Sequence, residues 1–277
     1  MASARKNNAQ RIVSLAPSVT SILVALGERR QIVAVSKWCK DVADVSGLPE
    51  LGDCWALDKS GDASALMELR PTLIVGSVPF KTETVQKILA LPVPFLALNP
   101  RSLADVSADI RVLGRAVQAN ARAEALVREM QRQFDRVRKT AKHAKTQPRV
   151  YCEAWPHPRI SSPPWVAELV DICGGVMITP AGQRVADEDV ARANPEVIVL
   201  AWAATGGKSK PEQALENGAW KDVSAVRERR VFAIRDELLN TPGPPLVCGA
   251  EELLRVIHPE LAGRGQKRRA AANSGGW

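Results

Sequence analysis

The residues ELRPTLIVG at 68–76 and ARANPEVIVLA at 191–201 share one pattern, a helix end followed by a proline and a strand of β-branched residues. The segments ahead of them repeat as well. RIVSLAPSVTSILVALGERRQIVAVS at 11–36 and RVYCEAWPHPRISSPPWVAELVDICGGVMITP at 149–180 both read as strand, turn, helix and strand. Strands that alternate with helices form parallel sheets covered by helices. The repeat therefore predicts two similar α/β lobes.

Between the lobes, apolar residues recur every three or four positions, which predicts one long helix over about 102–145 with a kink near Gln118–Asn120. Ser18 is predicted to be the N-cap of the first helix of the chain. Two Rossmann-like lobes joined by one long helix are expected to bind a ligand in a cleft between them. The predicted domains are an N-terminal α/β lobe at 1–101, the connecting helix at 102–147, a C-terminal α/β lobe at 148–261 and a disordered basic tail at 262–277.

The composition predicts a globular protein without a nucleic-acid partner. Of the 277 residues, 45% are hydrophobic and 25% charged, and no apolar run approaches the ~20 residues that a membrane span needs. The net charge of +8 comes largely from 122–149 and 264–269, where few aromatic residues accompany the basic ones. A nucleic-acid surface would combine basic and aromatic residues on one face. We expect a monomer.

The start of the chain and its cysteines predict a cytoplasmic protein. The first residues, MASARKNNAQ, lack the apolar segment of a secretory signal, although a signal removed from the sequence would make the protein periplasmic. Free cysteines at irregular spacing favour a reducing compartment. A disulfide between the loops that carry Cys39 and Cys54 would instead suit an oxidising one. The five cysteines are Cys39, Cys54, Cys152, Cys173 and Cys248.

The sequence offers no pattern typical of catalysis or of metal binding. It lacks G-x-S-x-G, the P-loop, G-x-G-x-x-G and H-E-x-x-H. Its three histidines, His143, His157 and His258, do not have the spacing of a metal site. We therefore expect a binding protein and not an enzyme.

Tryptophan is unusually frequent, with seven Trp against one Tyr and four Phe. Five of the tryptophans stand where predicted strands end or loops begin. In open parallel sheets, ligands bind outside the carboxyl ends of the strands. These indoles are therefore candidate contacts for a large, flat ligand, and three further residues are expected at the edge of the cleft. The predicted ligand-binding residues are Trp38, Trp55, Trp155, Trp165 and Trp202, with Pro17, Ser18 and Asp236 at the edge.

Several of these segments resemble a known family. RIVSLAPSVTSILVALG at 11–27 is similar to the opening of the cobalamin-binding branch of the helical-backbone periplasmic binding proteins, a superfamily that also binds ferric siderophores and haem. EAWPHPRISSPPWVAELVDICGG at 153–175 resembles a second segment of that branch. The resemblance covers about 11–260. It implies non-catalytic binding of a corrinoid such as cobalamin, either as the solute-binding protein of an ABC-type uptake system or as a cytosolic carrier.

Two departures from the family leave alternatives open. Ser21 stands where the family has a glutamate that can dock onto a membrane transporter, so a permease partner is in question. Lys37 replaces a histidine in SKWCKD at 36–41. One alternative keeps the fold and takes an anionic ferric siderophore or haem, for which Lys37, Lys40 and Lys59 would supply positive charge. The other is an enzyme or a cytosolic partner-binding protein on this scaffold.

Overall fold

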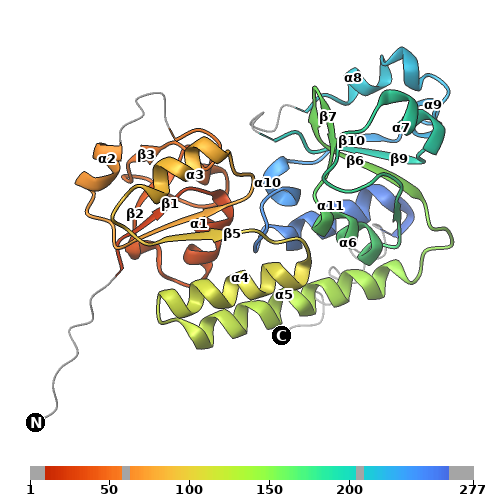
Figure 1. Cartoon of the computed structure of the whole chain (residues 1–277). Coiled ribbons are helices and arrows are strands. Elements are labelled where there is room, and N and C mark those ends of the chain that lie inside the picture. The colour runs from red at the N-terminus through yellow and green to blue at the C-terminus, as the bar shows by residue number, and fades with distance from the viewer. Residues whose placement is uncertain (1–9, 58–62, 204–208, 262–277) are drawn as a thin grey trace, which may run out of the picture. The chain divides into compact units, whose positions relative to one another are not determined.

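The computed structural model describes residues 10–57, 63–203 and 209–261. They form two compact α/β units, which confirms the two lobes predicted from the repeat (Figure 1). Unit 1 is drawn from residues 1–100 and 104–127, and unit 2 from residues 101–103 and 128–277. The predicted tail at 262–277 lies outside the described residues, as does Asp58, at which the sequence pattern predicts the start of a helix over 58–69.

Unit 1 contains a parallel sheet in the order β3-β2-β1-β4-β5. The central strand β1 is fully buried, as its run of apolar residues predicts. The strands are β1 (Ile12–Ser14), β2 (Ile32–Ser36), β3 (Glu50–Leu51), β4 (Leu73–Ser77) and β5 (Phe95–Leu98), and the accompanying helices are α1 (Pro17–Ala25), η1 (Arg29–Gln31), η2 (Cys39–Asp41), α2 (Ala63–Glu68) and α3 (Thr82–Leu89).

The start of α1 differs from the prediction. Ala16, and not Ser18, is its N-cap residue, and Pro17 occupies the first helical turn. Proline suits this position because its fixed φ is helical and its missing N–H would have no partner in the helix. Ser18 is buried within the helix, where its carbonyl accepts a hydrogen bond of 2.9 Å from Ser21 Oγ.

Unit 2 contains a mixed sheet in the order β10-β9-β6-β7, with β8 paired to the start of β6. Its pairs are parallel except β6–β7, an antiparallel pair that the sequence analysis did not predict. The strands are β6 (Arg149–Pro156), β7 (Arg159–Ser161), β8 (Val176–Met177), β9 (Val197–Leu200) and β10 (Val231–Ala233), and the helices are α6 (Pro164–Ile172), α7 (Asp187–Ala193), α8 (Pro211–Leu215), η3 (Gly218–Trp220), α9 (Ser224–Arg227), α10 (Asp236–Leu239) and α11 (Leu246–Ile257).

The sequence repeat is visible in the topology and in single contacts. The order β2-β1-β4-β5 of unit 1 matches β8-β6-β9-β10 of unit 2. Arg11, just before β1, donates to the carbonyl oxygen of Leu69 at 2.8 and 3.1 Å, at the end of α2. Arg149, at the start of β6, donates to the carbonyl oxygen of Asn194 at 3.0 Å, at the end of α7. We call these two contacts the arginine clamps. Each ties the first strand of a unit to the helix that precedes a neighbouring strand.

The stretch predicted as one kinked helix forms two helices, α4 (Leu103–Ala116) and α5 (Asn120–Ala141). Gln118 takes the left-handed conformation with a φ of 56°, which ends α4 where the kink was predicted. The chain then folds back, so that Arg111 of α4 pairs with Glu124 of α5 at 2.8 Å. A Cβ added to Gly114 would lie 2.5 Å from the Cβ of Ala123, so glycine permits this close approach.

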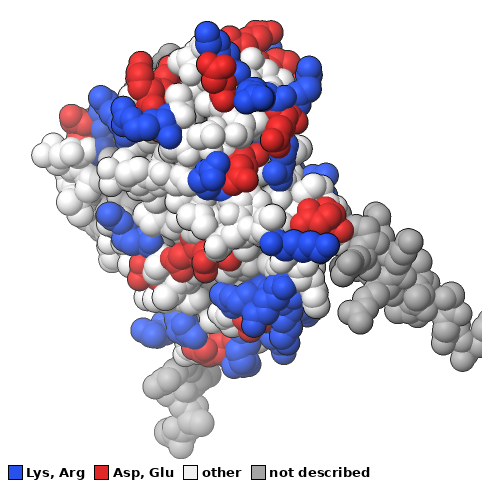
Figure 2. Space-filling model, turned by 90° about the vertical axis from the view of Figure 1, so that its right-hand side faces the viewer, with Lys and Arg blue, Asp and Glu red and all other residues white. Residues whose placement is uncertain are grey.

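Basic residues on α5 are partly neutralised along the helix itself. Asp135 pairs with Arg138 at 2.9 Å, and Glu129 pairs with Arg132 and with Arg136, which lies 3.6 Å away. The two pairs that are three residues apart, Asp135–Arg138 and Glu129–Arg132, are of the kind that stabilises a solvated helix. Figure 2 shows acidic and basic residues interspersed over most of the face it draws, with a denser group of Lys and Arg toward its lower end.

Candidate functional site

In unit 1, the predicted residues lie where strands of the sheet end. Pro17 and Ser18 follow β1, Trp38 follows β2 and Trp55 follows β3. Trp55 is 57% exposed, whereas Ser18 is buried and Pro17 and Trp38 are half-buried. Because parallel strands end at one edge of a sheet, these positions share the edge at which such sheets bind ligands.

Asp53 links the two tryptophan loops of unit 1. Its Oδ2 accepts a hydrogen bond of 3.2 Å from Trp38 Nε1, and its Oδ1 accepts one of 2.9 Å from the backbone N–H of Trp55. Sequence analysis gave Asp53 no role, because an aspartate in a loop is usually solvated. The structure shows that it fixes the backbone beside the exposed indole of Trp55.

The basic residues considered for an anionic ligand are placed differently from one another. Lys37 Nζ lies 4.5 Å from the centre of the Trp38 ring, so the cation covers one face of that indole. Lys40 is exposed. Lys59 lies outside the described residues.

In unit 2, Trp202 and Asp236 also follow strands, β9 and β10 respectively, and Trp155 is the next-to-last residue of β6. Trp155 is 38% exposed, and its Nε1 donates to the carbonyl oxygen of His157 at 2.9 Å. Trp202 is only 6% exposed. Asp236 is half-buried at the start of α10.

Trp165 belongs to the core of unit 2. It is 4% exposed, and its Nε1 donates to the carbonyl oxygen of Leu239 at 2.8 Å. A buried indole whose N–H is bonded to backbone packs against its neighbours and leaves almost none of its ring for a ligand. The prediction that Trp165 contacts a ligand therefore finds no support in its burial.

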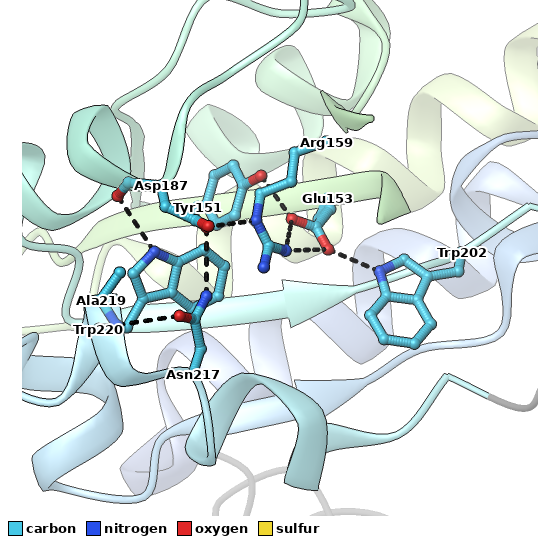
Figure 3. Close-up of polar contacts among 8 residues, drawn as sticks. All are labelled: Tyr151, Glu153, Arg159, Asp187, Trp202, Asn217, Ala219 and Trp220. Carbon is cyan, nitrogen blue, oxygen red and sulfur yellow. Dashed lines mark hydrogen bonds and ion pairs between the residues drawn. The ribbon is translucent and has the colours of Figure 1, made fainter. Parts of the chain in front are cut away.

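The centre of unit 2 contains a buried polar network around Glu153 (Figure 3). Its Oε2 accepts hydrogen bonds from the hydroxyl of Tyr151 at 2.7 Å and from Arg159 Nη1 at 2.8 Å. Its Oε1 accepts one of 2.8 Å from Trp202 Nε1. Both oxygens are thus occupied, as the burial of a carboxylate requires. Burial raises the pKa of the Tyr151 hydroxyl, and the charge of Glu153 raises it further, so Tyr151 stays protonated.

Arg159 is held from three sides. Its Nη1 bonds to Glu153, its Nε bonds to Asp187 Oδ1, and its guanidinium carbon lies 4.3 Å from the centre of the Trp220 ring. Burial alone would lower the pKa of Arg159, but the two carboxylates outweigh it and raise the pKa. Asn217 Nδ2 donates to Asp187 Oδ1 at 3.2 Å and fixes that carboxylate as well.

Four members of this network, Arg159, Asp187, Trp202 and Asn217, line a cavity of ≈ 370 Å³ that lies within unit 2. In this region the sequence analysis considered only three residues: Trp155 and Trp202, as ligand contacts, and His157, as one of the three histidines. The available signal was Glu153, a glutamate within an otherwise buried strand, since such a residue requires a cationic partner. The residues that line the cavity are Pro156, His157, Arg159, Asp187, Trp202, Gln213, Ala214, Glu216 and Asn217.

Within the part of the chain that the structure describes, no three His, Cys, Asp or Glu side chains are grouped so that they could hold a metal ion. The same residues contain no helix with the length and apolarity needed to cross a membrane.

Comparison with known proteins decides the family. The family model of the periplasmic binding proteins matches residues 12–238, most of the chain. The chain belongs to the periplasmic binding protein family. Among solved structures, the apo form of the periplasmic haem-binding protein RhuT from Roseiflexus is 23% identical with a TM-score of 0.77, covering 92% of this chain and 100% of that one. The vitamin B12-binding protein BtuF of Vibrio cholerae is 22% identical with a TM-score of 0.71, covering 90% and 96%.

Curated relatives of this periplasmic binding protein correct the predicted location. The ABC transporter substrate-binding lipoprotein YvrC of Bacillus subtilis is 24% identical over 92% of this chain and 82% of its own length. The vitamin B12-binding protein of Pectobacterium carotovorum is 23% identical over 88% and 87%. Because the relatives are lipoproteins or periplasmic proteins, the prediction of a cytoplasmic location is wrong. That prediction was based partly on the lack of an apolar segment in the first residues of the given sequence.

Proposed function

We propose that this protein is a non-catalytic, extracytoplasmic substrate-binding protein that delivers a cobalamin-like corrinoid to an ABC importer. One observation carries the choice of a large, flat ligand. Trp55 of unit 1 and Trp155 of unit 2 are the exposed tryptophans among the described residues; Trp55 follows β3, and Trp155 lies at the carboxyl end of β6. An exposed indole at the ligand-binding edge of an α/β sheet has little structural purpose, whereas it suits stacking on a flat ring.

The choice of corrinoid over haem rests on the supply of metal ligands. Haem iron in proteins takes an axial His, Cys, Met or Tyr. Tyr151 is the single tyrosine of the chain, and it is buried and bonded to Glu153. His258 is likewise buried, with Nδ1 3.0 Å from Glu260 Oε1. Cobalamin carries its own axial base, so it needs no such residue from the protein.

Haem is the second candidate because of His157. This histidine is exposed, lines the cavity of unit 2 and follows Trp155 closely in the chain. An imidazole beside an indole could bind iron axially while the ring stacks. Solved structures of haem-binding proteins with the same fold also support haem as the second candidate.

The proposed partner is the permease of an ABC importer, as for the relative YvrC. Ser21, which replaces an acidic residue of the family, is 6% exposed and donates to the Ser18 carbonyl oxygen. We propose that docking does not use the Ser21 side chain.

Absorbance spectroscopy tests the ligand. The purified protein is incubated with cyanocobalamin or with haemin, separated from free ligand by gel filtration, and scanned. We expect the corrin spectrum to travel with the protein and tryptophan fluorescence to be quenched on titration, with a Kd in the micromolar range or tighter, about −8 kcal/mol or more favourable. A haem spectrum with a His157-dependent band, and no retained corrinoid, would replace cobalamin by haem.

A further inference from the structure

Among the polar atoms of the residues that line the cavity of unit 2, a donor on Arg159 and an acceptor on Asp187 lie on neighbouring side chains and are not used by the described residues. Arg159 bonds through Nε and Nη1, and its Nη2 has no acceptor among those residues. Asp187 accepts its side-chain hydrogen bonds at Oδ1, and its Oδ2 has no donor among them. Figure 3 shows the two side chains next to each other, with the second terminal nitrogen of Arg159 outside the bonded network.

The charges around the cavity disfavour an anion. The carboxylates of Asp187 and Glu216 line it, against the single guanidinium of Arg159. That guanidinium is already paired with the buried carboxylate of Glu153. Nearby like charges raise the energy of a carboxylate in a partly buried site. A neutral group that both accepts and donates hydrogen bonds meets no such penalty.

We infer that this cavity binds a peripheral primary amide of the ligand and discriminates against a carboxylate at the same position. The inference rests on the proposed function, because cobalamin carries primary amides around its corrin ring whereas haem carries carboxylates. The amide oxygen accepts from Arg159 Nη2, and the amide NH₂ donates to Asp187 Oδ2. A primary amide supplies both roles within one planar group.

The donor is rigid before the ligand arrives. Arg159 is fixed by Glu153 and Asp187, and its guanidinium stacks on Trp220. Its side chain is 15% exposed. Binding therefore costs little side-chain entropy, which favours selective recognition of one arm of the ligand.

Hydrolysed cobalamins test the inference on the unmodified protein. Calorimetry compares cyanocobalamin with its separate monocarboxylate isomers, in each of which one peripheral amide is a carboxylate. We expect one isomer to bind about tenfold more weakly than cyanocobalamin, the cost of a lost hydrogen bond to a charged group, and the others to bind like the parent. Equal affinity for all isomers would overturn the inference.

The Asp187→Asn variant provides a second test. It replaces the acceptor Oδ2 by an amide donor and removes one negative charge from the cavity. The variant should bind cyanocobalamin more weakly and lose most of its discrimination against the disfavoured isomer. Asp189→Asn is the matched control, because Asp189 lies on the same helix in an exposed pair with Arg192 and outside the cavity. Unchanged discrimination in a folded Asp187→Asn variant would also overturn the inference.

The proposed function and the amide subsite can be rejected by different results. If cyanocobalamin does not bind at all, the proposed function fails and the amide subsite with it. If cyanocobalamin binds and the isomers are not distinguished, the proposed function stands and the amide subsite alone is rejected. Should Asp187→Asn not fold, the isomer series on the unmodified protein decides.

Discussion

At the scale of single residues, burial separates tryptophans that the sequence presents alike. Trp55 and Trp155 are exposed, whereas Trp165 is buried and its indole N–H is bonded to backbone. All three stand in loops or at helix starts in the sequence, so position alone could not divide them. The exposed pair are candidates for ligand contact, and the buried residue contributes to the stability of unit 2.

Replacing Trp55 or Trp155 by alanine is expected to weaken cobalamin binding by about 1–3 kcal/mol, the range for a central aromatic contact. The melting temperature of the unliganded protein should hardly change, because both side chains are exposed. Trp165→Ala is the matched control and should cost about 3–5 kcal/mol of stability, because it empties a buried site. Calorimetry and thermal unfolding measure the two effects. A loss of stability in Trp55→Ala or Trp155→Ala with affinity retained would contradict this prediction.

The Glu153 network gives a second prediction at this scale. Glu153→Ala should lower the free energy of unfolding by about 3–5 kcal/mol, because it leaves the half-buried Arg159 without its main partner. Tyr151→Phe removes one hydrogen bond to the same carboxylate and keeps the ring, so about 1–2 kcal/mol is expected. Urea unfolding compares the two. Similar costs for both variants would show that the ion pair contributes little.

At the scale of elements, the sequence predicted the long, strongly patterned segments well. The apolar pattern predicts helices over 82–89 and 187–193, which are the bounds of α3 and α7. It predicts strands over 12–15, 32–35 and 197–202, and β1, β2 and β9 lie within a residue or two of these ranges. The short strands β3 and β7 were missed, because two or three residues carry too little periodicity to predict a strand. β7 forms only through its antiparallel partner β6, a contact that no local pattern encodes.

The two copies of the repeat end their helices with different residues in the same conformation. Arg70 and Asn194 both have a φ of 46°, a left-handed conformation that asparagine adopts more readily than arginine. Arg70 is exposed, and its side chain forms no ion pair among the described residues. The backbone of unit 1 is therefore strained at Arg70, whereas Asn194 takes the same conformation in unit 2 with less strain.

Arg70→Asn is expected to raise the free energy of unfolding by about 0.5–1 kcal/mol, as relief of that strain. Arg128→Asn, an exposed position inside α5, should instead lower it by about 0.5 kcal/mol through reduced helix propensity. Chemical denaturation measures both. Destabilisation by Arg70→Asn would mean that the arginine side chain makes a contribution larger than the backbone strain.

At the scale of the whole molecule, the sequence indicated the fold and the family, and it failed on the compartment and on the cavity. The cavity depends on Arg159, Asp187 and Glu216, which come from separate elements and have no common motif. Their meeting is decided by the packing of α7 and α8 on the sheet, which a linear pattern does not express. The compartment was inferred from the first residues and from unpaired cysteines, and neither feature is part of the fold that the chain shares with its periplasmic relatives.

The five cysteines are all free thiols, which leaves the suggested disulfide between Cys39 and Cys54 without support. Four are buried and Cys248 is exposed. Burial raises the pKa of the Cys39 thiol, and raises those of Cys54 and Cys152 to about 12, so little reactive thiolate forms.

A thiol reagent should therefore modify one cysteine in the native protein and five after denaturation, with the native reaction abolished in Cys248→Ser. Mass spectrometry counts the modified sites. Fewer than five thiols in denatured protein purified from an oxidising compartment would reveal a disulfide in that preparation.

The arginine clamps also bear on how long the native state lasts. The Arg11 clamp joins positions 58 residues apart, and the Arg149 clamp joins positions 45 apart, so each closes a large loop of chain. Closing such a loop costs conformational entropy, and the hydrogen bonds of the clamp can offset this cost only once the loop has closed. We expect the two arginine clamps to form after the rate-limiting step of folding. Losing an interaction that is absent from the transition state mainly raises the unfolding rate. Removing either clamp, for instance by Arg11→Met, should shorten the lifetime of the folded protein far more than it slows refolding.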